Sequence, residues 1–182
     1  SASVRGELEL RMRRIAEETG GRAIFPYSLK QIDEAYDQIV EEIRTLAAAG
    51  TSEVTLLGQT VNAYGRARPG QVEGELAFAD LIRRVAEIPG IRRIRFTSPH
   101  PRFVTPDLIH AFAEVPELCP HLHLPVQSGS SRVLEAMSRR YDRETYLDVI
   151  DRVRKARPGI AIITDIRRGN LLQHLLYKAV FE

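Results

Sequence analysis

Four short apolar runs, partly β-branched and about 30 to 40 residues apart, constrain the fold of this 182-residue chain more than any other feature. They cover residues 53–57, 92–96, 121–126 and 160–164. Helical patterns fill the gaps between them, at residues 76–87, 106–115 and 143–156. Strand, helix and strand repeated at these intervals are typical of right-handed parallel units. We therefore predict an α/β fold with parallel strands, either an open or closed barrel or a doubly wound sheet.

Local signals predict where several helices begin and end. Thr105 and Asp142 are expected to cap the helices that follow them, and Gly50 is expected to end the helix before it in a left-handed conformation. Two more helices are predicted at residues 7–18 and 170–181. The second has an apolar face, which the barrel, a partner chain or a missing domain must cover.

Charge and cysteine content limit the classes of function. The net charge of +2 is too small to indicate nucleic-acid binding by itself. Cys119 is the single cysteine, so one chain can form neither an internal disulfide nor an all-cysteine metal or iron–sulfur site. With no apolar run long enough for a bilayer and no N-terminal leader pattern, we expect no membrane association and a cytoplasmic location.

Uncharged polar side chains follow each of the first three strands. Carboxyl ends of parallel strands meet at one edge of a sheet, so these side chains are expected to form a shared ligand site. Arg139, slightly farther along, is either a carboxylate partner or a surface arginine. Amides, hydroxyls and one imidazole suit a zwitterionic or nucleoside ligand that is oriented rather than hydrolysed. The candidate residues are Gln59, Asn62, Ser98, His100, Gln127, Ser128, Ser130 and Arg139.

A His-x-His pair, His121 and His123, lies within the third predicted strand. Alternate strand residues face the same way, so the pair could bind a metal, as in barrel hydrolases. No other histidine follows a later strand, and histidines packed or hydrogen-bonded inside the barrel are the favoured interpretation. We predict no metal site, and a metal-dependent barrel hydrolase remains an alternative function.

Four segments, in this order and spacing, resemble the radical S-adenosylmethionine (SAM) core of the tRNA methylthiotransferases. The resemblance covers about residues 35–166. Within it, residues 58–62 (Gly-Gln-Thr-Val-Asn) are more similar to the tRNA-modifying branch than to the branch that modifies a ribosomal protein. The four segments are residues 53–65 (EVTLLGQTVNAYG), 95–102 (RFTSPHPR), 119–141 and 163–166 (ITDI).

This resemblance implies a partial (βα) barrel that binds SAM across its strand ends. Enzymes of the family use one [4Fe–4S] cluster to cleave the cofactor to a 5′-deoxyadenosyl radical and a second cluster in sulfur insertion. They place a methylthio group on an adenosine beside the tRNA anticodon. The implied positions are Gln59 and Asn62 along the cofactor or substrate pocket, Ser98 and His100 on the adenosine or substrate side, Gln127, Ser128 and Ser130 beside the cofactor, and Arg139 on its carboxylate.

Both ends of the chain differ from the family pattern. The family holds its radical cluster with a Cys-x3-Cys-x2-Cys loop, but the register suggested by residues 24–27 places Ala16, Gly20 and Ala23 at the ligand positions. We expect one domain over residues 1–182, with a family-like core at 31–166, an atypical N-terminal segment at 1–30 and an atypical helical segment at 167–182.

The sequence therefore predicts the core of a tRNA methylthiotransferase whose own residues do not support radical chemistry. The SAM cofactor and the tRNA partner follow from the resemblance, and [4Fe–4S] is expected of the family but lacks ligands here. A shortened or altered enzyme and a cluster-free relative both fit. A non-catalytic nucleoside- or RNA-binding α/β module is the other alternative.

Overall fold

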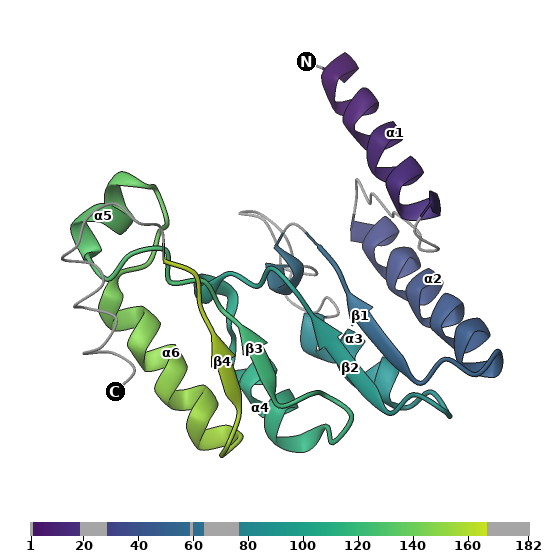
Figure 1. Cartoon of the computed structure of the whole chain (residues 1–182). Helices are drawn as coiled ribbons and strands as arrows, with labels where there is room; N and C mark the ends of the chain where they lie inside the picture. Colours follow the sequence, from purple (N-terminus) through teal and green to yellow (C-terminus); the bar gives the residue numbers. More distant parts are fainter. Residues whose placement is uncertain (1, 19–28, 59, 64–76, 167–182) are drawn as a thin grey trace. The chain divides into compact units, whose positions relative to one another are not determined.

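The computed structural model describes residues 2–18, 29–58, 60–63 and 77–166. It has two compact units, residues 1–39 and 40–182. Helix α1 (Ala2–Glu18) lies in the first unit, and helix α2 (Leu29–Ala48) crosses the boundary (Figure 1). Helix α1 begins five residues before the predicted start. The prediction began too late because no capping signal in the sequence marks the first turn.

The second unit alternates strands and helices as predicted. Short 3-10 helices, η1 and η2, occur in the loops after the first two strands. In chain order the elements are β1 (Glu53–Leu56), η1 (Val61–Ala63), α3 (Phe78–Ala86), β2 (Arg93–Phe96), η2 (Pro101–Phe103), α4 (Pro106–Glu114), β3 (His121–His123), α5 (Ser131–Ala136), α6 (Arg143–Ala156) and β4 (Ala161–Ile163).

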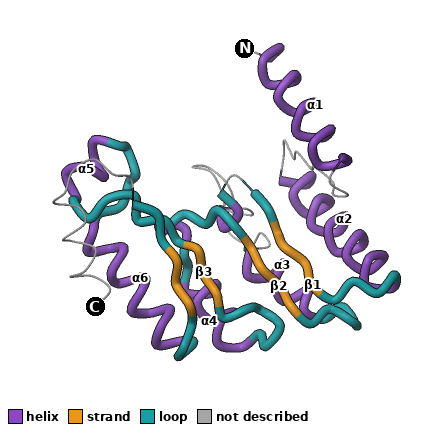
Figure 2. Tube along the Cα trace, viewed as in Figure 1, coloured by secondary structure: helices purple, strands orange, loops and turns teal. Residues whose placement is uncertain are grey.

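All four strands run parallel. β1 pairs with β2, and β3 pairs with β4. A parallel bridge between Ile94 and Leu118 joins the two pairs, with the Ile94 N–H donating to the Glu117 carbonyl at 2.8 Å. The strands thus form two two-stranded sheets, β1-β2 and β3-β4, linked by this bridge just before β3. Figure 2 shows the strands in orange. The predicted α/β fold is confirmed, and the arrangement is consistent with a partial barrel.

β3 is three residues shorter than predicted. Pro125 has no N–H, so regular pairing stops after His123. The Val126 N–H donates instead to the side-chain hydroxyl of Thr164 at 2.8 Å, and main-chain pairing resumes where the Gln127 N–H donates to the Asp165 carbonyl. The segment after β3 thus stays attached to the segment after β4, but by irregular contacts.

The core lies between the strands and helices α3, α4 and α6. Phe96 of β2 contacts Phe78 of α3 edge-on, with ring centroids 5.2 Å apart, and it contacts Phe112 of α4 at 5.9 Å. Leu122 and Leu124 are also buried. Burial of each such side chain stabilises the fold by about 1.5–3 kcal/mol. This packing holds the strands in place, so the positions at which the loops leave the strands are fixed.

Three predicted helix signals are confirmed. The Thr105 hydroxyl accepts a hydrogen bond from the Leu108 N–H at 3.2 Å, and the Asp142 carboxylate accepts one from the Thr145 N–H at 2.8 Å. Gly50 has a φ of 99°, the left-handed conformation predicted after α2. The predicted helix at residues 170–181 lies outside the described residues. In the part that is described, no helix has both the length and the apolar character to cross a membrane.

Candidate functional site

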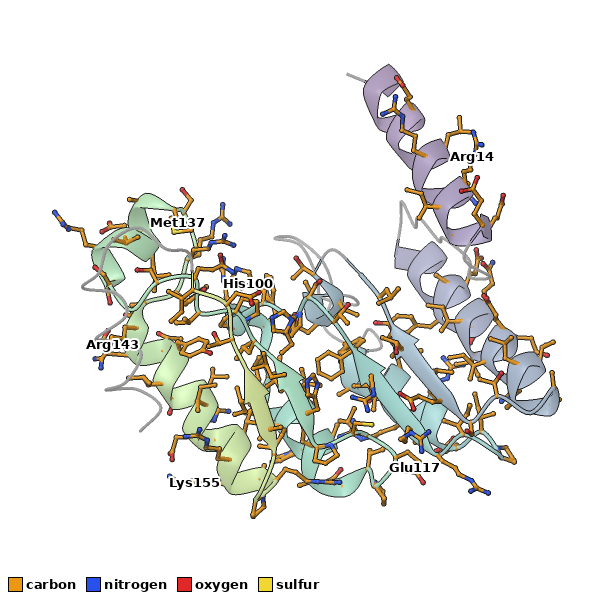
Figure 3. The ribbon with its side chains drawn as sticks, in the orientation of Figure 1. Arg14, His100, Glu117, Met137, Arg143 and Lys155 are labelled. Atoms are coloured by element: carbon orange, nitrogen blue, oxygen red, sulfur yellow. The ribbon has the colours of Figure 1, made fainter. Side chains whose placement is uncertain are left out.

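The loops after β1, β2 and β3 lie at the carboxyl ends of the strands. His100 marks this end of the sheet in Figure 3, whereas Glu117 lies toward the opposite end. Six of the eight predicted site residues fall in these described loops, and Arg139 lies in the turn between α5 and α6. The eighth, Gln59, lies outside the described residues.

Asn62 joins the loop after β1 to the loop after β2. Its side chain is 3% exposed, and its amide makes two reciprocal hydrogen bonds to the main chain of His100. The Asn62 Nδ2 donates to the His100 carbonyl at 3.0 Å, and the His100 N–H donates to Asn62 Oδ1 at 2.8 Å. The amide therefore fixes the path of the second loop.

His100 is half-buried and lies against two aromatic rings. Its ring meets Tyr141 edge-on at 5.3 Å and lies 5.5 Å from the ring of Phe103. Burial lowers the pKa of His100 below the usual 6.5, and the positive charges of Arg139 and Arg102 lower it further. The imidazole is therefore neutral at neutral pH.

Arg139, in the turn after α5, contacts Gln127 in the loop after β3. Arg139 Nη2 donates to Gln127 Oε1 at 3.3 Å. The Nε atom of Arg139 is buried and has no hydrogen-bond partner among the described residues. Burying an N–H without a partner is costly, so this side of the guanidinium suits an anionic or carbonyl ligand.

Four non-glycine residues in the described part of the chain have a positive φ: two follow the strands β2 and β3, and two lie in the turn after α5. Such conformations cost about 1–3 kcal/mol each and concentrate at functional sites. Two of these residues are predicted site residues, and the other two flank Arg139. The four are Ser98 (57°), Gln127 (66°), Ser138 (55°) and Arg140 (59°).

The two predicted serines of this loop lie together. Ser128 is fully buried, and its hydroxyl accepts a hydrogen bond from the Ser130 N–H at 3.2 Å. Ser130 precedes α5 without a side-chain capping bond. The structure thus brings together Asn62 with His100, Gln127 with Arg139, and Ser128 with Ser130. The contact of each residue with a ligand stays a prediction.

Two tyrosines that the sequence analysis did not include support this loop. The Tyr141 hydroxyl contacts the carbonyls of Pro125 and Val126, at 3.3 and 3.1 Å. The Tyr146 hydroxyl lies 2.8 Å from the Leu124 carbonyl and 3.2 Å from the Thr164 hydroxyl. Burial raises the pKa of Tyr146 to about 12, so the phenol stays protonated. Tyr146 occupies an apolar position in the helical pattern of α6, so the sequence does not indicate that its hydroxyl makes hydrogen bonds.

One histidine of the His-x-His pair, His123, makes a side-chain contact to the segment after β4. His123 Nε2 lies 3.0 Å from the Asp165 carboxylate, as expected for a hydrogen-bonded histidine. Among the described residues, no three histidine, cysteine or carboxylate side chains lie close enough to hold a metal ion.

Two hollows are found near the site, and neither is lined by more than one predicted residue. One, of about 20 Å³, lies beside Asn62 and has room for about one water molecule. The other is open and measures about 480 Å³. It is lined by Glu135, Ser138, Arg140, Tyr141 and Asp142.

These features define a class of protein, a parallel α/β protein with polar side chains gathered at the ends of its strands. The family profile described as "Radical SAM superfamily" matches residues 21–173, and the chain belongs to this superfamily. The family uses SAM and a [4Fe–4S] cluster. SAM fits the groups described above. The cluster does not fit, since it needs several thiolates and the chain has only the buried Cys119.

Curated relatives support the predicted branch of the superfamily. The chain is similar to proteins named tRNA-2-methylthio-N(6)-dimethylallyladenosine synthase. It is 51% identical to the one from Geobacter sulfurreducens, over 80% of this chain and 32% of the relative. It is 54% identical to the one from Mycobacterium avium, over 77% of this chain and 20% of the relative. The chain thus spans a third or less of the length of these relatives.

Proposed function

We propose that this chain is the SAM-binding core of a tRNA methylthiotransferase. The identity of about half over most of the chain to synthases of that name supports the assignment. The observation that carries the SAM site is the half-buried Arg139, whose Nε lacks a partner among the described residues beside the amide of Gln127. An arginine with free donors next to neutral polar groups suits an amino-acid carboxylate.

The residues of this chain bind and orient the cofactor in this proposal. Arg139 holds the carboxylate, and Gln127 orients the guanidinium through its amide oxygen. His100, Ser98 and the serines after β3 supply neutral donors and acceptors to the adenosine or substrate side. SAM supplies the methyl and adenosyl groups when it is bound. Because the chain lacks the thiolates for a [4Fe–4S] cluster, no radical step is assigned to it.

The proposal extends to partners and location. The name of these relatives identifies tRNA as their substrate, so tRNA is the proposed substrate of the enzyme to which this core belongs. A cytoplasmic location follows from that role. The arrangement of residues 1–182 as one core domain, and a partner or further domain covering residues 170–181, remain predictions.

Titration with S-adenosylhomocysteine, followed by calorimetry, tests the proposal. We expect saturable binding by the chain and a loss of about tenfold or more in affinity for Arg139→Ala, because a charge-assisted pair is removed. Arg132→Ala is the matched control, since it removes the same charge from an exposed position in the nearby helix α5. Absence of binding at millimolar ligand, or equal losses in both variants, contradicts the proposed site.

A further inference from the structure

The hydrogen bonds of Asn62 require both halves of an amide. The His100 main chain presents an N–H and a carbonyl to the side chain, so the side chain must accept at one atom and donate at the other. The partners also fix which way the amide is turned. Aspartate has the same shape but would place an acceptor against the His100 carbonyl. With 3% of Asn62 exposed, little of its surface remains for a ligand.

The loop held by Asn62 also fixes the protonation pattern of the His100 ring. His100 precedes η2, and its Nδ1 accepts a hydrogen bond from the Arg102 N–H at 3.2 Å. Nδ1 therefore carries no proton, and in the neutral ring the proton is on Nε2. A shift of the His100 main chain moves Nδ1 away from that N–H and lets both tautomers form.

The surroundings of His100 favour this single form. The rings of Tyr141 and Phe103 limit how the imidazole can turn. Arg139 and Arg102 are the charged groups near the ring, and their positive charges oppose its protonation. His100 Nε2 is thus a fixed N–H donor, and Arg139, proposed to hold a carboxylate, is near enough to the ring for its charge to lower the pKa of His100.

We propose that Asn62 is a positioning residue, which acts through His100 to present the Nε2–H as a donor to the ligand that Arg139 binds. The proposal rests on the proposed SAM site and deepens it. It replaces a direct ligand contact for Asn62 with an indirect role. The ligand it selects carries both a carboxylate and, on the adenosine or substrate side, a hydrogen-bond acceptor. Binding of a ligand whose group facing the Nε2–H is protonated, and so cannot accept a hydrogen bond, is disfavoured.

Two histidine variants separate the donor from the helix-capping role. His100→Asn keeps an acceptor where Nδ1 lies but has no group at the Nε2 position. His100→Gln places an amide N–H near the Nε2 position but loses the cap to Arg102. With S-adenosylhomocysteine as the probe, we expect about tenfold weaker binding for the asparagine variant and affinity within about threefold of wild type for the glutamine variant. The reverse order overturns the proposal.

Asn62→Asp tests the positioning role itself. We expect about tenfold weaker binding of S-adenosylhomocysteine, and ring-nitrogen NMR of the ligand-free protein is expected to show both His100 tautomers instead of one. A purely structural role lowers the unfolding temperature but leaves the tautomer and the affinity of the folded protein unchanged, and that result overturns the proposal. If Asn62→Asp does not fold, Asn62→Ser, which keeps a single hydrogen bond, is read in the same way.

The NMR measurement also distinguishes this proposal from the proposed function. If the wild-type chain does not bind S-adenosylhomocysteine, the SAM site fails. The control of His100 by Asn62 is still decided in the free protein by the tautomer. If the chain binds the ligand and the tautomer is unaffected by Asn62→Asp, the SAM site stands and the positioning role fails.

Discussion

The two ends of the strands are held together in different ways. At the amino ends, Glu53 of β1 pairs with Arg93 and Arg95 of β2, at N–O distances of 2.5 and 2.8 Å. These three side chains are 36%, 53% and 41% exposed. At the carboxyl ends, the polar side chains of Asn62 and Tyr146 are buried and bond mainly to the main chain of neighbouring loops.

This difference agrees with the expected role of each end, since the ligand is expected at the carboxyl ends only. Exposed ion pairs exchange readily with water and add little to stability, so they tolerate change. A buried side chain that bonds to the main chain fixes the path of a loop, because a misplaced loop leaves a polar atom without a partner. Two of the non-glycine residues with a positive φ in the described chain, Ser98 and Gln127, also follow the carboxyl ends of strands. The loops are therefore held most firmly at the carboxyl ends of the strands, where a ligand is expected.

The strongest test of this comparison is Tyr146→Phe, because it removes a buried hydroxyl that contacts the Leu124 carbonyl and the Thr164 hydroxyl. We expect the free energy of unfolding to fall by about 1–3 kcal/mol, measured by denaturant titration. Tyr141→Phe is the matched comparison. Its contacts are longer, at 3.1 and 3.3 Å, so its effect should be smaller. If the free energy of unfolding of Tyr146→Phe equals that of wild type, the comparison between the two ends is wrong.

The parts of the fold that depend on neighbours in sequence could be predicted. Strand and helix periods gave the order of the elements, and the caps at Thr105 and Asp142 follow from the residue type and the helix that it precedes. The end of β3 was placed too late because the apolar run continues past Pro125. The missing N–H of that proline interrupts pairing although the side chains stay buried on alternate positions.

The support of the site could not be predicted in the same way. The partner of Asn62 is the main chain of a residue 38 positions away, and a main-chain partner leaves no sequence signal. The contact of Tyr146 depends on the register between α6 and the segments after β3 and β4. Residue types at the strand ends therefore predicted where a site lies, while the hydrogen bonds that hold it follow only from the packed structure.

A smaller effect is expected from relieving strain at Ser98, whose φ is 57°. Glycine adopts this conformation without cost, so Ser98→Gly should raise the free energy of unfolding by up to about 1 kcal/mol. Ser52→Gly is the matched control just before β1, where φ is not positive, and it should lower stability by about 0.5–1 kcal/mol. Denaturant titration measures both. If both variants lower the free energy of unfolding, backbone strain at Ser98 does not set the carboxyl ends of the strands apart from the amino ends.

The smallest effect is expected from Glu53→Gln at the amino ends. Hydrogen bonds from Arg93 and Arg95 lower the pKa of Glu53 below its usual 4.5, so its contribution to stability is present above that pH and is lost as the pH falls through the folded-state pKa. Because the carboxylate is exposed, we expect little change in the unfolding temperature at neutral pH. The affinity for S-adenosylhomocysteine should equal that of wild type. A loss of affinity comparable to that of Asn62→Asp would show that the strand starts also shape the site, since no described contact links Glu53 to the loops at the other end.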